Sequence, residues 1–265
     1  MLDLSVVIIA CNEERIIGKT LEAVAPFAGE IILVDSGSTD KTVEIARQYK
    51  AQCHHQQWRG YAAQKNYALS LATKKWILSL DADEIVTEPL TREITTLLSA
   101  STQSYTGYRI PRLLYIGDKS LKHGGFYPDA QLRLFQNGKG KFIERKVHES
   151  VEVDGTVGTL KSPLFHYAYI DFNDYASTLD KYAQLSAQEF AEREHKTTNG
   201  DHSAPKSWRA TKLNEMFHPA WTFFYRYILR AGFLDGLRGL KANWIYKDYV
   251  RKKISYLRQL SNNIR

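Results

Sequence analysis

Residues 76–84 read WILSLDADE, and this stretch decides the fold. Residues 76–80 form a short run that is apolar apart from one serine, which is typical of a β-strand buried on both faces. Asp81 and Asp83 follow two positions apart, so both carboxylates of the turn can face one site. Such oxygen ligands hold Mg²⁺ or Mn²⁺ and leave positions open for substrate phosphates. Acidic turns are common after strands. Here the turn follows a buried strand, and this position favours a metal site.

Two more buried strands come earlier in the chain. Residues 4–10 (LSVVIIA) and 30–34 (EIILV) have the same apolar, β-branched character. Helices are predicted between the strands, over 16–24, from the loop at 35–40 to about Tyr49, and over 64–71. Strands that alternate with helices form a parallel α/β sheet, which binds ligands at the carboxyl edge of its strands. The polar clusters that end all three strands therefore lie where a ligand is expected.

The second half of the chain has a different character. Residues 107–169 are rich in Gly, Tyr and short alternating segments, which predict antiparallel strands and active-site loops. One amphipathic helix is expected from Phe172 to about Lys196, followed by a linker over 197–206. The expected domains are a catalytic domain at 1–205, divided into 1–104 and 105–196, and a helical tail at 206–265.

Composition and length restrict the class of protein. The 265 residues are 43% hydrophobic and 25% charged, which excludes a disordered chain, a collagen-like chain and a polytopic membrane protein. The two cysteines, Cys11 and Cys53, are too few for a disulfide-stapled secreted domain. The N-terminus lacks the basic region of a signal peptide, and no apolar run is long enough to span a bilayer. A cytoplasmic protein is therefore expected.

Positive charge is concentrated near the end of the chain. Residues 205–265 hold 13 Lys or Arg against 3 Asp or Glu, whereas the rest of the chain has a net charge of −3. Basic residues mixed with Trp and Tyr are typical of a helix at the level of lipid headgroups. We therefore expect residues 206–265 to bind an anionic membrane surface; the alternative is a helical cap whose aromatic residues pack on the main domain. Nucleic acid is not expected as a partner, because no nucleic-acid-binding signature accompanies the charge.

The loop after the second strand holds another candidate. An acidic residue at the end of such a strand, here Asp35, can accept hydrogen bonds from a ribose hydroxyl or a base N–H. Ser38, Thr39 and Asp40 suffice to cap the following helix, so Asp35 is predicted to bind a ligand. The first loop lacks Gly-x-Gly-x-x-Gly, which argues against a nicotinamide or flavin enzyme.

Four motifs in order resemble those of family-2 inverting glycosyltransferases with the glycosyltransferase-A fold. They are SVVIIACNEE (5–14), ILVDSGSTDKT (32–42), GYAAQKNYAL (60–69) and LSLDADE (78–84). Residues 105–170 and HPAWTFFYRYILRAGFLDGL in the tail are similar to a subgroup that includes lipopolysaccharide-core β-1,4-glucosyltransferases. The resemblance implies an α/β, Rossmann-like fold over 4–170, with a mostly parallel sheet, a smaller antiparallel part and a C-terminal helical extension.

The resemblance also implies a nucleotide-sugar site and its metal. Asp83 would be the principal ligand of Mg²⁺ or Mn²⁺, with Asp81 on metal or ribose and His166 as a further metal or diphosphate contact. The alternative for His166 is a structural histidine. The residues that the resemblance implies for donor binding are Ala10, Asn12, Glu13, Asp35, Gln64, Lys65, Asp81 and Asp83. Arg133 is added to them because it alternates with Leu132 and Leu134 on a strand and can face the site.

Some of these residues also have a plain structural interpretation. Gln64 and Lys65 begin a helix whose terminus and positive charge suit a diphosphate, but they would equally fit a solvated helix face. The planar guanidinium of Arg133 suits a phosphate or an acceptor carboxylate, but Arg133 would equally fit the surface of a strand.

An inverting transfer is a single displacement that needs a general base for the acceptor hydroxyl. The candidates are Glu149, Asp129 and Glu144, all in the antiparallel segment. Glu149 is preferred because VHES (147–150) matches the pattern of the subgroup. Asp129 is the second choice, and its alternative role is that of a turn residue after proline.

The resemblance implies transfer of a hexose, glucose from UDP-glucose, to a lipopolysaccharide-core or similar lipid-linked glycan at the inner membrane. Two other functions stay open: a sugar-phosphate nucleotidyltransferase, and a non-enzymatic binding module that docks on a membrane. The acidic loop Asn12-Glu13-Glu14 counts against the first, because such enzymes need a Gly-rich basic loop there. The donor sugar, the acceptor hydroxyl and the oligomeric state are left open by the sequence.

Overall fold

The stretch at 4–10 is an inner strand of the sheet in the computed structural model, which describes residues 1–100, 102, 104–143, 150–197 and 211–263. It pairs in parallel with the two other strands that were expected from apolar runs. The parallel strands, in spatial order, are β3 (Gln52–His55), β2 (Glu30–Asp35), β1 (Leu4–Ala10) and β4 (Trp76–Asp81).

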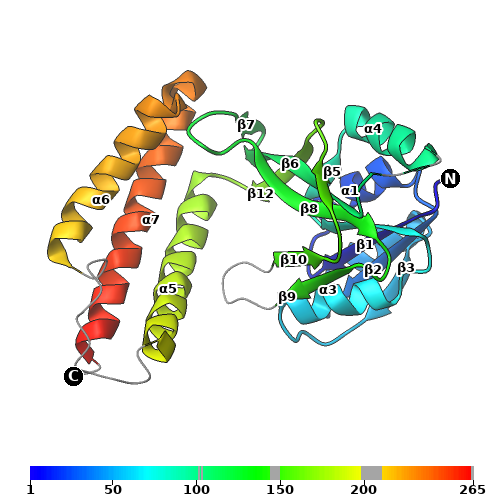
Figure 1. The fold of residues 1–265 in the computed structure, drawn as a ribbon, viewed down its shortest axis with the longest axis horizontal. Helices are drawn as coiled ribbons and strands as arrows, with labels where there is room; N and C mark the ends of the chain where they lie inside the picture. The colour runs from blue at the N-terminus through cyan, green and yellow to red at the C-terminus, as the bar shows by residue number, and fades with distance from the viewer. Residues whose placement is uncertain (101, 103, 144–149, 198–210, 264–265) are drawn as a thin grey trace. The chain divides into compact units, whose positions relative to one another are not determined.

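Strands from the middle of the chain extend this sheet beyond β4. In spatial order they are β8 (Asp129–Gln136), β6 (Gly107–Ile116), β12 (Leu164–Tyr169) and β5 (Glu84–Val86), with β7 (Lys119–Leu121) and β11 (Val157–Thr159) paired to β6. A separate antiparallel pair consists of β9 (Gly140–Ile143) and β10 (Ser150–Val153). The expected α/β fold, with its smaller antiparallel part, is confirmed (Figure 1).

Helices connect the parallel strands as expected, and the structure also contains one helix and one strand that the sequence analysis did not predict. The connecting helices are α1 (Ile17–Val24), α2 (Thr42–Gln48), α3 (Tyr61–Ser70) and, beyond the acidic turn, α4 (Glu88–Ser99). The sequence analysis missed α4, although Thr87 caps it and a proline lies in its first turn. It also missed β3, because the polar sequence QCHH lies at the edge of the sheet and carries no apolar signal.

Alternate residues of the inner strands pack into two different cores. Val6 and Ile8 of β1 belong to the core that includes residues of α1 and α4, whereas Val7 belongs to the core that includes Ala68 of α3. The inner strands are thus buried on both faces, which explains their continuous apolar sequences. This burial fixes the edge at which their polar ends emerge.

The chain divides into two compact units. Unit 1 comprises Met1–Leu113 and Pro128–Ala168, and unit 2 comprises Leu114–Tyr127 and Tyr169–Arg265. The helices of unit 2 are α5 (Phe172–Thr197), α6 (Lys212–Phe224), the π-helix η2 (Tyr225–Leu229), the 3₁₀-helix η3 (Gly232–Asp235) and α7 (Gly236–Asn263). The domain boundary expected at 205 lies outside the described residues. Within those residues, no helix is both long and apolar enough to cross a bilayer.

A polar cluster holds the helices of unit 2 together. Asn243 is completely buried; its Nδ2 donates to the carbonyl of Gly239 at 2.7 Å, and its Oδ1 accepts from Nε of Arg226 at 3.1 Å. The Arg226 guanidinium lies 4.0 Å from the ring centroid of Tyr246, a geometry that favours cation–π attraction. Because backbone and side chains meet so closely, this junction needs small residues at Gly232 and Gly239.

We predict opposite effects for two glycine-to-alanine changes within helices. A Cβ on Gly239 would overlap the backbone carbonyl oxygen of Gly232, so Gly239→Ala should lower the free energy of unfolding by about 2 kcal/mol or more. A Cβ on Gly18 of α1 would meet a side-chain methyl of Ile45 at 3.6 Å, an ordinary contact. Gly18→Ala should therefore stabilise the protein by about 0.5–1 kcal/mol. Urea unfolding followed by circular dichroism tests both, and destabilisation by Gly18→Ala alone would contradict the packing described.

Candidate active site

The polar ends of three parallel strands lie side by side at one edge of the sheet. In the register of β1 and β2, Ala10 lies opposite Asp35, and in that of β1 and β4, Ile9 lies opposite Asp81. The predicted donor-binding residues of the first, second and third strands are therefore neighbours. This is the carboxyl edge, where α/β sheets bind ligands.

The first two loops are joined by hydrogen bonds through Asn12. Its backbone N–H donates to Oγ of Ser38 at 2.9 Å, and its Oδ1 accepts from the N–H of Thr39 at 2.8 Å. Asn12 has a φ of 58°, a left-handed conformation that asparagine tolerates better than most residues. Asn12 thus holds the shape of both loops, whichever ligand they meet.

The Asp35 carboxylate holds the shape of its own loop. It is 6% exposed and accepts from the N–H groups of Gly37 at 2.9 Å and Ser38 at 3.0 Å. Asp40 accepts from the N–H of Thr42 at the start of α2, at 2.9 Å. The expectation that Asp35 is not needed to cap the helix agrees with this arrangement, but its carboxylate also has a structural task in the turn.

Asp81 lies between two buried cations. Its Oδ1 is 2.6 Å from Nζ of Lys65, and its Oδ2 is 2.5 Å from an Nη of Arg133. Loss of water around the carboxylate opposes ionisation, but the charges of Arg133 and Lys65 outweigh it and hold the pKa of Asp81 well below its usual range. Lys65 is 2% exposed and Arg133 is 5% exposed, so the surface interpretation of both residues is wrong.

A chain of ion pairs continues from Arg133 into the interior. The same Nη of Arg133 lies 2.7 Å from Oε1 of Glu84, which is completely buried, and this oxygen is 3.0 Å from Arg112. Arg112 in turn contacts Asp129 at 2.5 Å. We call the six residues the ion chain: Lys65, Asp81, Arg133, Glu84, Arg112 and Asp129. It contains three cations and three carboxylates, so its charges balance.

Glu84 and Arg112 were not singled out from the sequence. Glu84 looked like one more acid of the turn, although it is the first residue of β5. Arg112 interrupts the apolar residues of β6, and a lone arginine in such a strand is the signal that was available. Its partners come from other strands, so only the tertiary structure identifies them.

Asp83 and His166 lie together beside the ion chain. Oδ2 of Asp83 is 3.5 Å from Nε2 of His166, and the N–H of Tyr167 donates to the carbonyl of Asp83 at 3.0 Å. The turn is also held from α1, because the hydroxyl of Thr20 donates to the carbonyl of Ala82 at 2.7 Å. β12 therefore brings the predicted histidine to the predicted principal metal ligand.

The residues present fit a cation that is shared with a substrate. No group of three or more His, Cys, Asp or Glu suited to a metal occurs in the part of the chain that the structure describes. However, Mg²⁺ and Mn²⁺ in phosphate-transfer sites take one or two protein ligands and complete their shell with substrate phosphates and water. One carboxylate oxygen and one imidazole nitrogen, as in Asp83 and His166, meet that requirement.

Glu13 is a partly buried acid near Asp83, and its pKa is raised. Removal from water and the nearby Asp83 carboxylate raise the pKa of Glu13 to about 7. Burial is the larger of these causes, and the Asp83 carboxylate adds negative potential at this point of the edge. Such a potential favours a bound cation.

Gln64 places a buried acceptor near the same edge. Its side chain is 1% exposed, and its Nε2 donates to the backbone carbonyl of Gln56 at 2.8 Å. Its Oε1 has no hydrogen-bond partner within the described residues. A buried acceptor of this kind is costly unless a ligand or water donates to it.

Of the three candidate bases, only Asp129 lies in the described part of the chain. Burial opposes ionisation of Asp129, but the Arg112 charge and hydrogen bonds outweigh it and hold the pKa of Asp129 below its ordinary value. A lowered pKa makes a carboxylate a weaker base. Glu149 and Glu144 lie outside the described residues, so the preference for Glu149 stays a prediction.

We predict that Glu13 makes stability depend on pH. Because the pKa is raised to about 7 in the folded protein from 4.5, the folded protein holds a proton between these values that the unfolded chain has released. Stability therefore falls as the pH rises through this window. Glu13→Gln should raise the free energy of unfolding by about 1–2 kcal/mol at about pH 8, allowing for partial exposure, and change it little at about pH 4.

Urea unfolding at both pH values measures this effect. Glu88→Gln is the matched control, because that side chain is 82% exposed on α4. The same gain for Glu13→Gln at both pH values would contradict the assignment.

We further predict that the interior of the ion chain matters more for stability than its exposed end. Glu84→Gln leaves the buried Arg133 and the partly buried Arg112 with one carboxylate fewer and should cost about 3–5 kcal/mol of unfolding free energy. Asp129→Asn changes a side chain that is 45% exposed and should cost about 1 kcal/mol or less. Denaturant titration of both variants makes the comparison, and equal losses would exclude the described role of Glu84.

Comparison with known proteins identifies the family of this chain. The family model for glycosyl transferase family 2 matches residues 5–148. The lipopolysaccharide core biosynthesis glycosyltransferase LpsC of Rhizobium meliloti is 33% identical over 198 residues, which cover 72% of this chain and 73% of LpsC. An uncharacterized glycosyltransferase of Rickettsia felis is 30% identical over 267 residues, covering 97% of this chain and 89% of that protein.

One solved structure matches this chain over nearly its whole length. Residues 1–349 of Staphylococcus aureus TarS match with a TM-score of 0.48 and 15% identity, covering 98% of this chain and 90% of that one. The family model alone spans more than half of the chain, and the match to LpsC covers more than two thirds of both proteins. The expected glycosyltransferase activity is thereby confirmed, and the reading as a non-enzymatic module is set aside. This chain belongs to glycosyl transferase family 2.

Proposed function

We propose that this glycosyltransferase moves a hexose, glucose in the first instance, from a UDP-sugar to a lipopolysaccharide-core or similar lipid-linked glycan, with inversion at the anomeric carbon. The observation that carries the proposal is the meeting of Asp81, Asp83 and His166 at the carboxyl edge of the sheet. One carboxylate is fixed between buried cations, and the next is paired with a histidine across the turn. Such a site suits a leaving group that carries two phosphates.

The nucleoside end of the donor is proposed to lie along the first two loops. Ala10, Asn12 and Glu13 border it from β1, and Asp35 borders it from β2. The hydrogen bonds through Asn12 support this placement, because they hold both loops in shape before a ligand arrives. The buried Oε1 of Gln64 would accept from an N–H or hydroxyl group of the donor.

The diphosphate end is proposed to meet the acidic turn. Lys65 and Arg133 act there through Asp81, since they keep that carboxylate ionised and hold it in one orientation. Asp83 and His166 would hold Mg²⁺ or Mn²⁺, and Asp81 would reach the ribose or the metal. When bound, the cation would neutralise charge that develops on the departing diphosphate.

The acceptor hydroxyl needs a base that is strong enough near neutral pH. Asp129 is a poor choice, because its pairing with Arg112 lowers its basicity. Glu149 therefore stays our proposed general base. It would accept the proton of the acceptor hydroxyl as the oxygen attacks the anomeric carbon.

The acceptor class is proposed from the relatives and from the tail. LpsC is described as a lipopolysaccharide core biosynthesis glycosyltransferase, and its likeness extends over most of both chains. The basic, aromatic tail suits a protein that works at an anionic surface. We therefore propose a peripheral enzyme on the cytoplasmic face of the inner membrane.

The first test is a donor screen that detects the nucleotide released. UDP-glucose with Mn²⁺ or Mg²⁺ and extracted core lipid should yield free UDP and a glycosylated lipid, and chelation by EDTA should stop the reaction. A parallel incubation with UTP and glucose 1-phosphate tests the alternative, because release of pyrophosphate with formation of UDP-glucose would support the sugar-phosphate nucleotidyltransferase. Transfer from a GDP-sugar alone would overturn the assignment of the donor.

The second test changes the two proposed metal ligands. Asp83→Asn and His166→Ala should each lower transfer by about 100-fold or more, because charge neutralisation of the leaving group is worth several kcal/mol. Titration calorimetry of Mn²⁺ in the presence of UDP should show weaker binding by both variants. Glu88→Gln, which changes an exposed carboxylate on α4, is the control. Full turnover of Asp83→Asn after chelation would overturn the proposal.

A further inference from the structure

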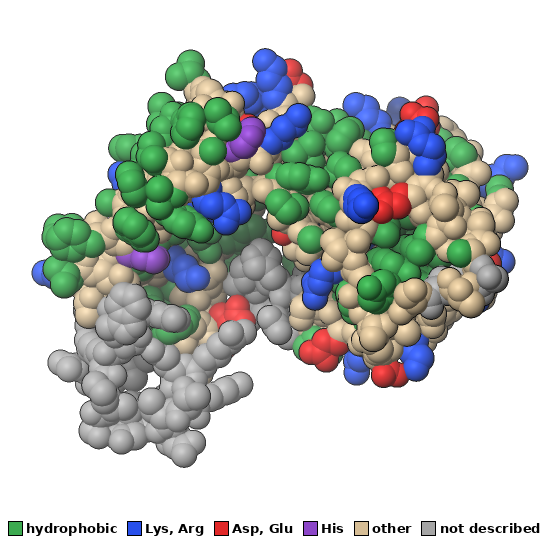
Figure 2. Space-filling view, turned by 45° about the horizontal axis from the view of Figure 1, so that its top comes forward, with side chains coloured by type: hydrophobic (Ala, Val, Ile, Leu, Met, Phe, Trp, Pro, Cys, Tyr) green, Lys and Arg blue, Asp and Glu red, His purple; other side chains and the backbone are tan. Residues whose placement is uncertain are grey.

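The helices of unit 2 expose many large apolar side chains on one stretch of the chain. Between residues 213 and 244 the exposed fractions are high, for example 57% for Trp221 and 84% for Leu237. We call these exposed apolar side chains of 213–244 the apolar ridge. Figure 2 shows hydrophobic side chains gathered on the part of the surface that these helices form. Exposed apolar surface of this extent usually marks an interaction site.

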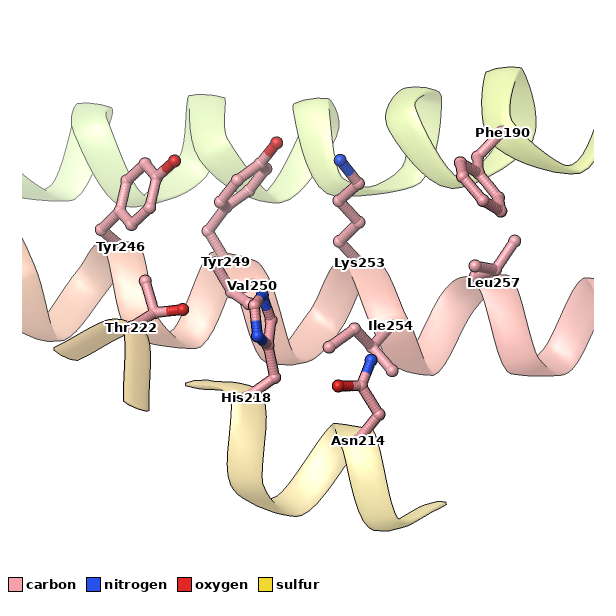
Figure 3. Close-up of a pocket in the computed structure, with 10 residues that line it drawn as sticks. All are labelled: Phe190, Asn214, His218, Thr222, Tyr246, Tyr249, Val250, Lys253, Ile254 and Leu257. Atoms are coloured by element: carbon pink, nitrogen blue, oxygen red, sulfur yellow. The ribbon is translucent and has the colours of Figure 1, made fainter. Parts of the chain in front are cut away.

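Helix α6 exposes its apolar face and directs polar side chains toward α7. Leu213, Phe217, Trp221 and Phe224 recur at helical spacing and are all exposed. The residues one position further on, Asn214, His218 and Thr222, face α7 and line a cavity of about 410 Å³ (Figure 3). A surface helix in water has the opposite pattern, with its apolar stripe toward the core. The outer face of α6 is therefore suited to an apolar environment.

The apolar ridge continues past α6 with the same spacing. Phe233, Leu237, Leu240 and Trp244 follow one another at intervals of three or four residues through η3 and the first turns of α7. All four side chains are exposed. The second half of α7 presents no exposed large apolar residue within the described part of the chain. The ridge thus has a defined end.

Positive charge exceeds negative charge in the part of the chain that carries the apolar ridge. Each acidic residue of 211–263 contacts a basic side chain: Glu215 with Arg258 at 2.9 Å, Asp235 with His123 at 2.9 Å, and Asp248 with Arg251 at 2.8 Å. Lys247 lies 3.8 Å from the ring centroid of Trp244, at the end of the ridge. Since basic residues far outnumber acidic ones here, the surface that covers the ridge should be anionic.

Two occupants fit an exposed apolar surface, and the charge favours one of them. A second copy of the chain would bring two identical basic surfaces together, which costs electrostatic energy. A bilayer with anionic lipids supplies both an apolar interior and opposite charge. Trp and Lys together, as at Trp244 and Lys247, are typical of the headgroup level.

We propose that the apolar ridge is a membrane-insertion surface that lies in the headgroup–acyl boundary of an anionic bilayer, with α6 parallel to the membrane. The inference deepens the proposed function and rests on it for the identity of the acceptor, because a lipid-linked glycan is presented at such a surface. Its own evidence is the exposed apolar face of α6 together with the surrounding positive charge.

The test uses the full chain and vesicles, without donor or acceptor. Co-sedimentation with phosphatidylethanolamine–phosphatidylglycerol vesicles should exceed that with phosphatidylcholine vesicles and should weaken at high salt. Phe217→Ser combined with Leu237→Ser should reduce partitioning by about tenfold or more. Ile170→Ser is the matched control, because Ile170 is 59% exposed in unit 2 but lies outside the ridge.

A second measurement reports insertion directly. Brominated acyl chains should quench the tryptophan fluorescence of the bound protein. Trp221→Phe with Trp244→Phe keeps the ridge apolar, so this variant should still bind vesicles but lose most of the quenching. Binding without any quenching in the unmodified chain would overturn insertion.

Other outcomes separate the alternatives. Vesicle binding by the Phe217→Ser, Leu237→Ser variant equal to that of the unmodified chain would overturn the proposal, and so would a dimer in solution that this variant dissociates. UDP binding by the same variant should be unchanged, because the changes lie outside unit 1. Loss of vesicle binding by the variant with normal UDP binding supports the ridge. In the unmodified chain, vesicle binding without UDP binding would count against the proposed donor alone.

Discussion

The candidate site depends on one buried carboxylate, that of Glu84. It compensates Arg133 and Arg112 at the same time and thereby lets two guanidinium groups remain in the interior. Burying a charge without a partner costs several kcal/mol, so the loss of Glu84 would destabilise both arginines. Through Arg133 the constraint reaches Asp81, and through Arg112 it reaches Asp129. One interior contact therefore links the carboxyl end of β4 to two neighbouring strands.

This arrangement gives the two carboxylates of the acidic turn different tasks. The charge of Asp81 is balanced by Lys65 and Arg133, so Asp81 attracts a further cation less strongly than Asp83 does. Asp83 has a histidine beside it in place of a lysine or arginine, and its charge adds to the burial that raises the pKa of Glu13 to about 7. Negative potential thus remains on the Asp83 side of the turn. A cation that arrives with a diphosphate would be drawn to that side.

The sequence predicted the elements whose signal is local and missed those whose signal depends on partners. The apolar runs of β1, β2 and β4 were sufficient, since burial on both faces leaves a continuous apolar pattern. The edge strand β3 has a polar sequence, and its pairing with β2 could not be read from four residues. Lys65 and Arg133 were named as candidates, but their burial could not be predicted, because it depends on Asp81 and Glu84, which come from other elements.

Charge serves opposite purposes in the two units. In unit 1 the important cations are buried and paired, so their fields are strong at short range and little affected by salt. Around the apolar ridge, cations such as Lys247 lie at the surface, where attraction acts over about 10 Å and is screened by salt. Under the proposed function, donor binding should therefore tolerate changes in ionic strength that weaken any attachment through the tail. An enzyme built in this way can change its residence at a charged surface without altering the geometry of its site.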